Sequence, residues 1–234
     1  METNTKQIIV DEYIKRLSFS NSCKLAYEYA EKCHRSTNHR YDDLPYTEGH
    51  LTPVVQYAKK YIDVLIDAFP GITYDEIELA VASGWTHDTI EDTRQTLNDV
   101  RKICGHTIAL ITYALSNEKG MTRKERANAK YYKGIRRTHF ATYIKVCDRL
   151  ANVRHSYLKT PNISQTVMRK PSMLDMYRNE HVDFINKLKP TWLEQLVNLY
   201  ETFVGRKPAY DGMALFKAMK PMFELLEYML YSKE

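Results

Sequence analysis

Several features of secreted and membrane proteins are scarce in this sequence of 234 residues. Its four cysteines (Cys23, Cys33, Cys104 and Cys147) do not form a C-x-x-C pair, which is the usual spacing of structural zinc and redox sites. No apolar run approaches the roughly 20 residues needed to cross a bilayer, and segment 1–10 is polar with no signal-peptide core. We therefore expect reduced thiols, no membrane segment and a location in the cytoplasm.

Glycine and proline are also scarce, with eight residues of each, and most of them fall between stretches of helical periodicity. Period-two alternation, the pattern of strands, is rare. We predict an all-α protein with helices over 6–17, 21–36, 50–68, 74–88, 106–116, 122–136, 140–158, 164–188, 191–203 and 212–231. The breaks between them are expected near Pro70-Gly71, Lys119-Gly120, Pro161, Pro190 and Gly205–Pro208. A further short helix is expected to begin at Thr96.

The chain is long enough to bury one good core, and nothing in it requires two domains. We assign residues 1–190 to one helical domain and residues 191–234 to a C-terminal helical extension. The apolar residues of the extension recur at helical spacing, so we expect it to pack on the same domain or on a partner subunit. A homo-oligomer is therefore left open.

The formal net charge is only +5. Binding of nucleic acid usually requires a dense basic block, whereas the densest positive stretch here, 123–137, also contains Glu125. Charge alone does not separate RNA from a small phosphorylated substrate. We prefer the small substrate, because the positive charge is modest.

The most informative stretch is W-T-H-D-T-I-E-D-T at 85–93. If this stretch is helical, Glu91 follows His87 by one turn and Asp92 follows Asp88 by one turn, so each pair shares a face. Gathering such groups at one place costs solvation and repulsion. A bound divalent cation is the usual reason for a protein to tolerate that cost.

Two imidazoles and two carboxylates are the candidate metal ligands: His50, His87, Asp88 and Asp148. This mixed set of nitrogen and oxygen donors suits Mn²⁺, Fe²⁺, Co²⁺ or Zn²⁺. Glu91 and Asp92 exceed the number of ligands needed, so we assign them jointly to orienting or deprotonating a water molecule. The alternative for this pair is a role as surface acids or as caps of the turn before Thr96.

A phosphoryl substrate also requires cations, and the candidates are Arg40, Lys145, Arg149 and Arg154. Asn152 follows Asp148 by one helical turn and offers an amide to hydroxyl or phosphate groups. A further cationic group lies at Arg123, Lys124 and Arg126. For that group we prefer an ordinary solvated helix face.

Three segments resemble the motifs of one family. Ala30, His34, Arg40, Pro45-Tyr46 and His50 occur in order, followed by H-D-T-I-E-D-T at 87–93 and K-V-C-D-R-L-A-N-V-R at 145–154. In these residues the chain resembles the HD-domain phosphohydrolase superfamily, and more narrowly the RelA/SpoT-type branch that hydrolyses the alarmones ppGpp and pppGpp. The segments 116–126 and 177–188 are similar to the linker and the following helix of that branch. The resemblance covers about residues 25–190.

The resemblance implies an all-α HD-domain bundle in residues 1–190. It implies that His50, His87, Asp88 and Asp148 bind one metal ion, generally manganese, that Glu91 and Asp92 are the catalytic acids, and that Arg40, Tyr46 and Asn152 contact the substrate. The implied reaction is hydrolysis of the 3′-pyrophosphate of ppGpp or a related nucleotide. The alternatives are an HD-type nucleotidase for another phosphoester and a non-catalytic module that binds nucleotide or RNA.

The first motif departs from the family pattern. The segment Tyr46 to His50 has one residue more than usual, Leu51 replaces a frequent proline, and the glycine expected before Pro45 is missing. These differences concern the guanine and ribose pocket rather than the metal ligands.

Overall fold

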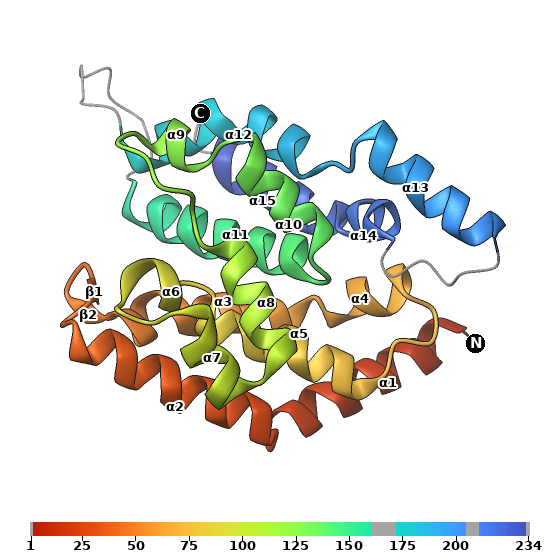
Figure 1. The fold of residues 1–234 in the computed structure, drawn as a ribbon, viewed down its shortest axis with the longest axis horizontal. Coiled ribbons are helices and arrows are strands. Elements are labelled where there is room, and N and C mark those ends of the chain that lie inside the picture. Colours follow the sequence, from red (N-terminus) through yellow and green to blue (C-terminus); the bar gives the residue numbers. More distant parts are fainter. Residues whose placement is uncertain (1, 161–171, 205–210, 233–234) are drawn as a thin grey trace.

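The computed structural model describes residues 2–160, 172–204 and 211–232 (Figure 1). Helices make up nearly all of its regular structure. In the described ranges the only sheet is a small antiparallel hairpin of β1 (Arg40–Tyr41) and β2 (Leu44–Pro45). The prediction of an all-α protein is thus confirmed.

The first half of the chain begins with two long helices and continues through shorter ones: α1 (Glu2–Leu17), α2 (Asn21–Ser36), the π-helical turn η1 (Thr47–Leu51), α3 (Thr52–Lys60), α4 (Ile62–Ala68), α5 (Tyr74–Thr86), α6 (Thr89–Asp92), α7 (Leu97–Cys104) and α8 (His106–Leu115). The second half is built around one helix of 19 residues, α11. Its elements are α9 (Arg123–Arg126), α10 (Ala129–Arg137), α11 (Ala141–Lys159), α12 (Met173–Leu188), α13 (Trp192–Phe203), α14 (Gly212–Ala218) and α15 (Lys220–Tyr231).

Capping boxes fix where α5, α7, α9 and α12 begin. In each of them a Ser or Thr hydroxyl accepts a bond from the backbone N–H three residues later, and the acidic side chain at that later position accepts from the N–H of the cap. The caps are Thr73, Thr96, Thr122 and Ser172. These reciprocal bonds satisfy backbone donors that a helix start leaves without a partner.

Three predicted helices are interrupted in the structure. The predicted helix 50–68 breaks at Tyr61 and starts with a π turn. The predicted helix 122–136 breaks because Asn128 caps α10, accepting a bond from the N–H of Tyr131. The predicted helix 212–231 breaks at Met219, just before a proline in the first turn of α15.

Two other boundaries differ in part from the prediction. The predicted helix 74–88 ends earlier, at Thr86. The predicted helix 164–188 is described only from Met173. The breaks expected at Pro161 and at Gly205–Pro208 lie outside the described residues.

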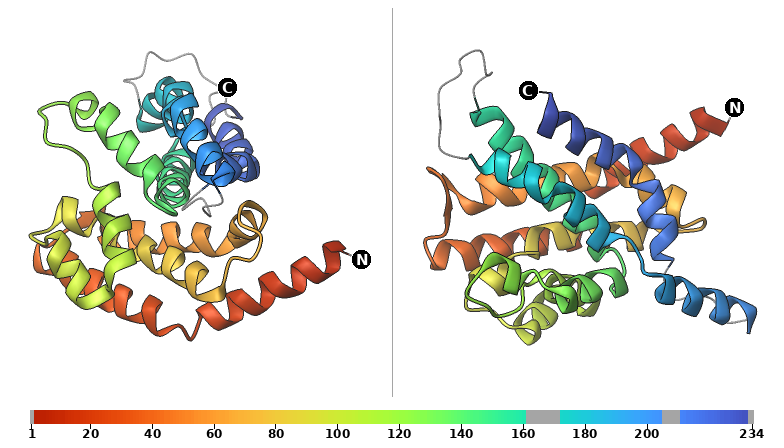
Figure 2. Two further views of the ribbon diagram at one scale, coloured as in Figure 1. Left: turned by 45° about the vertical axis from the view of Figure 1, so that its right-hand side comes forward. Right: turned by 90° about the horizontal axis from the view of Figure 1, so that it is seen from above.

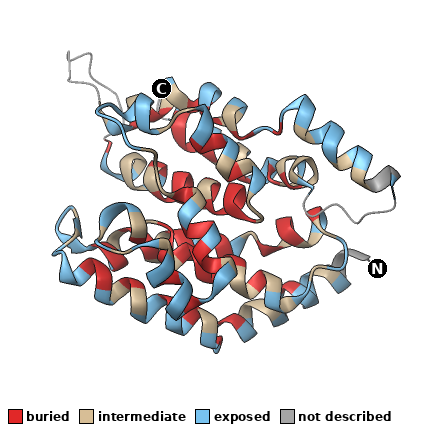
Figure 3. Ribbon diagram, viewed as in Figure 1, coloured by how far each residue is buried: buried red, intermediate tan, exposed pale blue. Residues whose placement is uncertain are grey.

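The core is centred on α5 and α11, which pack against different sides of α3 (Figures 1 and 3). Helices α2 and α8 also pack on α5, while α12 and α15 pack on α11. The inward side of α11 is fully buried, and the Tyr143 hydroxyl donates to the carbonyl of Ala58 at 2.5 Å. This packing brings α3, α5 and α11 together although they are far apart in sequence.

The C-terminal helices α14 and α15 pack on α4, α11 and α12 through buried Leu215, Met222 and Leu226. Helix α13 lies at the periphery (Figure 2), where Trp192 and Leu199 are largely exposed. The domain division at residue 190 stays a prediction. None of the described helices is long and apolar enough to cross a membrane.

Candidate metal centre

Three separate elements supply the predicted metal ligands. His50 lies in η1, His87 and Asp88 lie between α5 and α6, and Asp148 lies on α11. Helix α5 can approach α3 because position 84 is glycine: a Cβ atom there would lie 3.1 Å from Cγ2 of Val55. The Val55 side chain or the helices would have to shift by a few tenths of an ångström to relieve such a contact.

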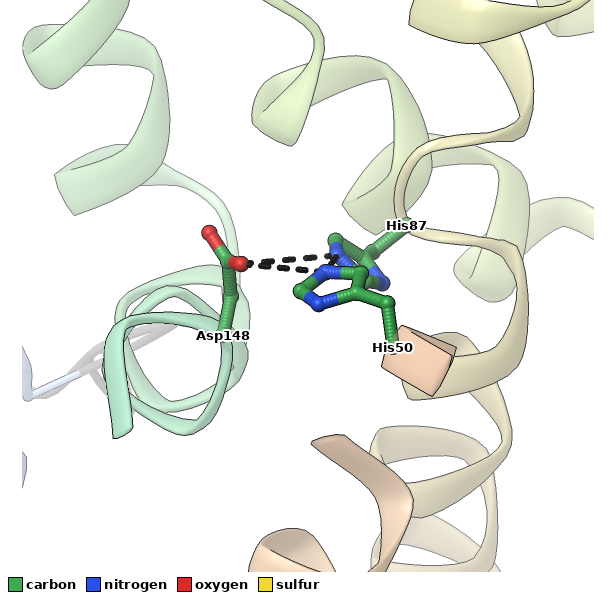
Figure 4. A group of neighbouring side chains, drawn as sticks. All are labelled: His50, His87 and Asp148. Atoms are coloured by element: carbon green, nitrogen blue, oxygen red, sulfur yellow. Dashed lines mark hydrogen bonds and ion pairs between the residues drawn. The ribbon is translucent and has the colours of Figure 1, made fainter. Parts of the chain in front are cut away.

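The side chains of His50, His87 and Asp148 point toward one another (Figure 4). The Nε2 atoms of His50 and His87 lie 3.3 Å apart. Oδ1 of Asp148 lies 3.3 Å from Nε2 of His50 and 3.8 Å from Nε2 of His87. Oδ2 of Asp88 is 3.3 Å from Nε2 of His50 and 3.0 Å from Nε2 of His87. The structure therefore brings together the four side chains that the sequence analysis selected as ligands.

Four of these five separations, 3.0–3.3 Å, match those of atoms that share one cation, and the fifth, between His87 and Asp148, is wider at 3.8 Å. Neighbouring ligands bound at about 2.1 Å lie about 3.0–3.4 Å apart in tetrahedral or octahedral geometry. Nδ1 of His87 lies 2.9 Å from the carbonyl of Gly84, which directs the Nε2 lone pair of that ring toward the other ligands. The spacing and the donor atoms both fit a divalent cation.

The electrostatics of the cluster also favour a cation. Burial lowers the pKa of His50, but Asp148 and Asp88 raise it more, to about 9. The pKa of His87 is likewise raised, because Asp88 and Asp148 outweigh its burial. Two protonated rings would then face each other across 3.3 Å. One divalent cation supplies the same two positive charges while both imidazoles stay neutral.

Tyr46 lines the cavity next to the ligands and contacts one of them. Its hydroxyl donates to Oδ2 of Asp88 at 2.5 Å. Its ring stacks on His39 and His34, with centroids 3.8 and 4.7 Å away. The hydroxyl of Tyr46 thus orients Asp88, and its role as a substrate contact stays a prediction.

Glu91 and Asp92 lie beside the cluster, but they do not continue helix α5, which ends at Thr86. The carboxylate of Glu91 accepts bonds from Nδ2 and from the backbone N–H of Asn117, at 2.5 and 3.2 Å. Burial and the carboxylates of Asp88 and Glu91 raise the pKa of Asp92 to about 7. Neither acid caps the next helix, because Asp99 performs that role with Thr96.

A second set of side chains holds Asp148 in place. Lys145 donates to Oδ2 of Asp148 at 2.9 Å, and Nδ2 of Asn152 donates to its Oδ1 at 2.6 Å. The Tyr41 hydroxyl in turn donates to Oδ1 of Asn152 at 2.7 Å. Lys145 and Asn152 both line the cavity and are both bonded to Asp148, and their role as substrate contacts stays a prediction. Tyr41 was not identified from the sequence.

We expect Tyr41→Phe to weaken cation binding about tenfold, in the range of changes to groups that orient metal ligands. Without the hydroxyl, the Asn152 amide is free to rotate away from Asp148. Tyr57→Phe is the matched control, because Tyr57 lies on α3 outside the cavity. Titration of both variants with Mn²⁺, followed by calorimetry, measures the change. Equal affinities in the two variants would contradict the role of Tyr41.

A cavity of about 600 Å³ extends from the metal ligands toward α9 and α12. Arg149 lines it, and so do Arg123, Lys124 and Arg126. These last three are exposed residues of α9, as expected of a solvated helix face, and that face borders the cavity. The sequence analysis also missed several lining residues on α12. These residues are Tyr177, Glu180, Phe184 and Lys187. They recur on one face of the helix, and this spacing was the pattern in the sequence that could have identified them.

Arg40 and Arg154 do not line this cavity. The Arg40 guanidinium donates to the carbonyl of Asp43 within its own hairpin. Arg154 is exposed on α11, on the side of Tyr57. Their role as substrate contacts stays a prediction, which rests on the resemblance for Arg40 and on charge for Arg154.

The bundle is all-helical, and it brings a His-Asp pair from one segment close to a histidine and an aspartate from two other segments. This arrangement is expected of an HD-domain phosphohydrolase. Sequence comparison finds relatives of that class. A "Guanosine-3′,5′-bis(diphosphate) 3′-pyrophosphohydrolase MESH1" from Danio rerio is 31% identical over 75 residues, which are 32% of this chain and 42% of that protein. The protein of the same name from Drosophila melanogaster is 28% identical over the same shares.

The chain is therefore related to HD-type ppGpp hydrolases. It matches 42% of the length of these curated relatives. No family model matches the chain.

Proposed function

We propose that this protein is a metal-dependent phosphohydrolase that removes the 3′-pyrophosphate of ppGpp or a closely related nucleotide. The observation that carries the proposal is the cluster of His50, His87, Asp88 and Asp148 at one end of a cavity lined by cations. The relatives named above support the substrate. We further propose Mn²⁺ as the cation, on the basis of the family resemblance; the imidazole and carboxylate donors fit this ion, as they also fit Fe²⁺, Co²⁺ and Zn²⁺.

The cavity is electrically polarised, which suits a substrate with more than one phosphoryl group. Carboxylates dominate the end at the metal ligands: Asp88, Glu91, Asp92 and Asp148. Cations dominate the end at α9 and α12: Arg123, Lys124, Arg126, Arg149 and Lys187. The acidic end is suited to a cation and the basic end to an anion, so a nucleotide with separated phosphates would satisfy both.

A bound divalent cation polarises a phosphoryl oxygen and makes water more acidic. Asp92 lines the cavity beside the ligands and is placed to accept a proton from the attacking water. Burial and the carboxylates of Asp88 and Glu91 raise its pKa to about 7, and the charge of a bound cation would lower this pKa and favour the ionised carboxylate. Glu91 is held by Asn117 and is a fixed acceptor for orienting that water. In-line attack at phosphorus then releases pyrophosphate and the nucleoside 5′-diphosphate.

We propose the cytoplasm as the location. All four cysteines are free and buried. Reduced thiols are typical of a reducing compartment.

The proposed activity predicts release of pyrophosphate from ppGpp by the purified protein supplied with Mn²⁺. Pyrophosphate and nucleoside diphosphate should form in equal amounts, measured by chromatography of the products, and a chelator should stop the reaction. A panel of NADPH, deoxynucleotides and nucleoside monophosphates tests the substrate. Faster release of phosphate from a monophosphate would instead indicate a nucleotidase. Binding without turnover of any substrate would indicate a non-catalytic module.

A further inference from the structure

Glu180 joins two guanidinium groups that come from different parts of the chain. Nε and Nη2 of Arg123, on α9, donate to the two carboxylate oxygens of Glu180 at 3.0 and 3.3 Å. Nη1 of Arg149, on α11, donates to Oε2 at 3.3 Å. All three residues line the cavity that begins at the metal ligands. The carboxylate therefore occupies a cationic part of the substrate cavity.

The two arginines differ in how firmly they are held. Arg149 is buried, with its guanidinium 4.8 Å from the ring centroid of Tyr177 and 4.2 Å from that of Phe184. The side chain of Arg123 is 51% exposed and that of Glu180 is 33% exposed. An ion pair this open to water contributes little to folding. The Arg123–Glu180 pair can therefore separate when a competing anion arrives.

Guanidinium groups bind carboxylate and phosphate with the same paired geometry. Two of them around one carboxylate form a place that also suits a phosphoryl group. Lys124 and Arg126 lie beside Arg123 on the cavity wall, and neither has an ion-pair partner among the described residues. This end of the cavity thus retains positive charge that Glu180 does not neutralise.

We propose that Glu180 acts as an internal competitor: its carboxylate occupies an anion subsite formed by Arg123 and Arg149, and a phosphoryl group of the substrate displaces it. This inference rests on the proposed function, because it assumes a substrate with a phosphoryl group remote from the one attacked. Glu180 would then set the selectivity of the cavity. Only a ligand with enough charge at that end displaces the carboxylate.

A purely structural role for Glu180 predicts the opposite sign. If the carboxylate only tethers α9 to α12, its removal loosens Arg123 and weakens anion binding. If it competes with the anion, its removal strengthens binding. The direction of the change therefore separates the two roles.

The test is binding of inorganic pyrophosphate to the full chain by calorimetry, with a chelator present so that no bound cation contributes. We expect Glu180→Gln to bind pyrophosphate about tenfold more tightly, as is typical when a charge-assisted bond no longer competes. Glu180→Asp, which shortens the acid, should show a smaller gain. Thermal unfolding establishes that each variant is folded.

Glu194→Gln is the matched control. Glu194 forms a similar two-bond pair with Arg136, at 2.9 and 3.3 Å, outside the cavity. The pyrophosphate affinity of the Glu194→Gln variant should equal that of the unchanged protein. A general effect of removing one negative charge would raise both affinities alike and would overturn the proposal.

The gain in pyrophosphate affinity should also depend on Arg123. In an Arg123→Gln background, Glu180→Gln should no longer tighten binding, because the subsite is incomplete. Unchanged or weaker binding in Glu180→Gln itself would refute the competitor role. Since this readout involves no hydrolysis, it is separate from failure to cleave ppGpp, which bears on the proposed function alone.

Discussion

Replacement of His87 by alanine is expected to remove both the proposed cation and the proposed phosphohydrolase activity. Nε2 of this buried ring lies 3.0 Å from Oδ2 of Asp88 and 3.3 Å from Nε2 of His50, and alanine has no donor atom to replace it. Loss of the cation removes several kcal/mol of transition-state stabilisation, which corresponds to a fall in rate of at least about a thousandfold. Metal content by elemental analysis and release of pyrophosphate from ppGpp measure the two effects.

His181→Ala is the control for that variant. His181 is also a buried histidine, but it lies on α12 facing Glu227 and outside the cavity. This control should keep its cation and its activity even if it is somewhat less stable. Asp148→Asn is a second, milder change at the centre and should also lose the cation. Full activity of Asp148→Asn without bound metal would refute the proposed centre.

The ligand set could be predicted because its residue types are restricted and its motifs are local. His87 and Asp88 are adjacent, and few other reasons exist for such a pair followed by two more acids. His50 and Asp148 could be added only through the spacing of the family motifs. Their convergence depends on α3, α5 and α11 packing together, which no local pattern specifies.

The surrounding contacts could not be predicted, since they depend on tertiary structure. Tyr41 and Asn152 are separated by 111 positions, and neither side chain carries a charge that would mark it. The position of Arg123 on the cavity wall could not be predicted either, because it depends on where α9 lies. Thr122 caps the start of this short helix, and Asn128 caps α10 and so divides the predicted helix 122–136 in two. The sequence predicts an exposed cationic face here, but it does not indicate that this face borders the cavity.

The position of Arg154 outside the cavity follows from helix geometry. Residues two apart on a helix point about 200° away from each other. Asn152 faces Asp148, so Arg154 on the same helix must point elsewhere, and it does not line the cavity. Lys145 and Asn152 do line the cavity, and their bonds to Asp148 are contacts that the sequence did not predict.

Replacement of both catalytic candidates, Glu91→Gln with Asp92→Asn, is expected to stop turnover while cation binding persists. Neither carboxylate is among the four ligands, and both side chains line the cavity next to them. The amides keep the size of the acids and the bond from the Asn117 N–H, but they cannot accept a proton from water. Rate losses of about 10²–10⁴ are typical when a proton acceptor is removed. Single-turnover assays with ppGpp and elemental analysis give the rate and the metal content.

Asp11→Asn with Glu12→Gln is the matched control, because it changes an adjacent, exposed acidic pair on α1 by the same chemistry. Its turnover should be unchanged. If the double variant at 91 and 92 bound its cation and still hydrolysed ppGpp at the normal rate, the pair would have no part in the reaction. If it lost the cation instead, the two acids would have to be counted among the groups that hold the metal, because their negative charge would then be needed for binding.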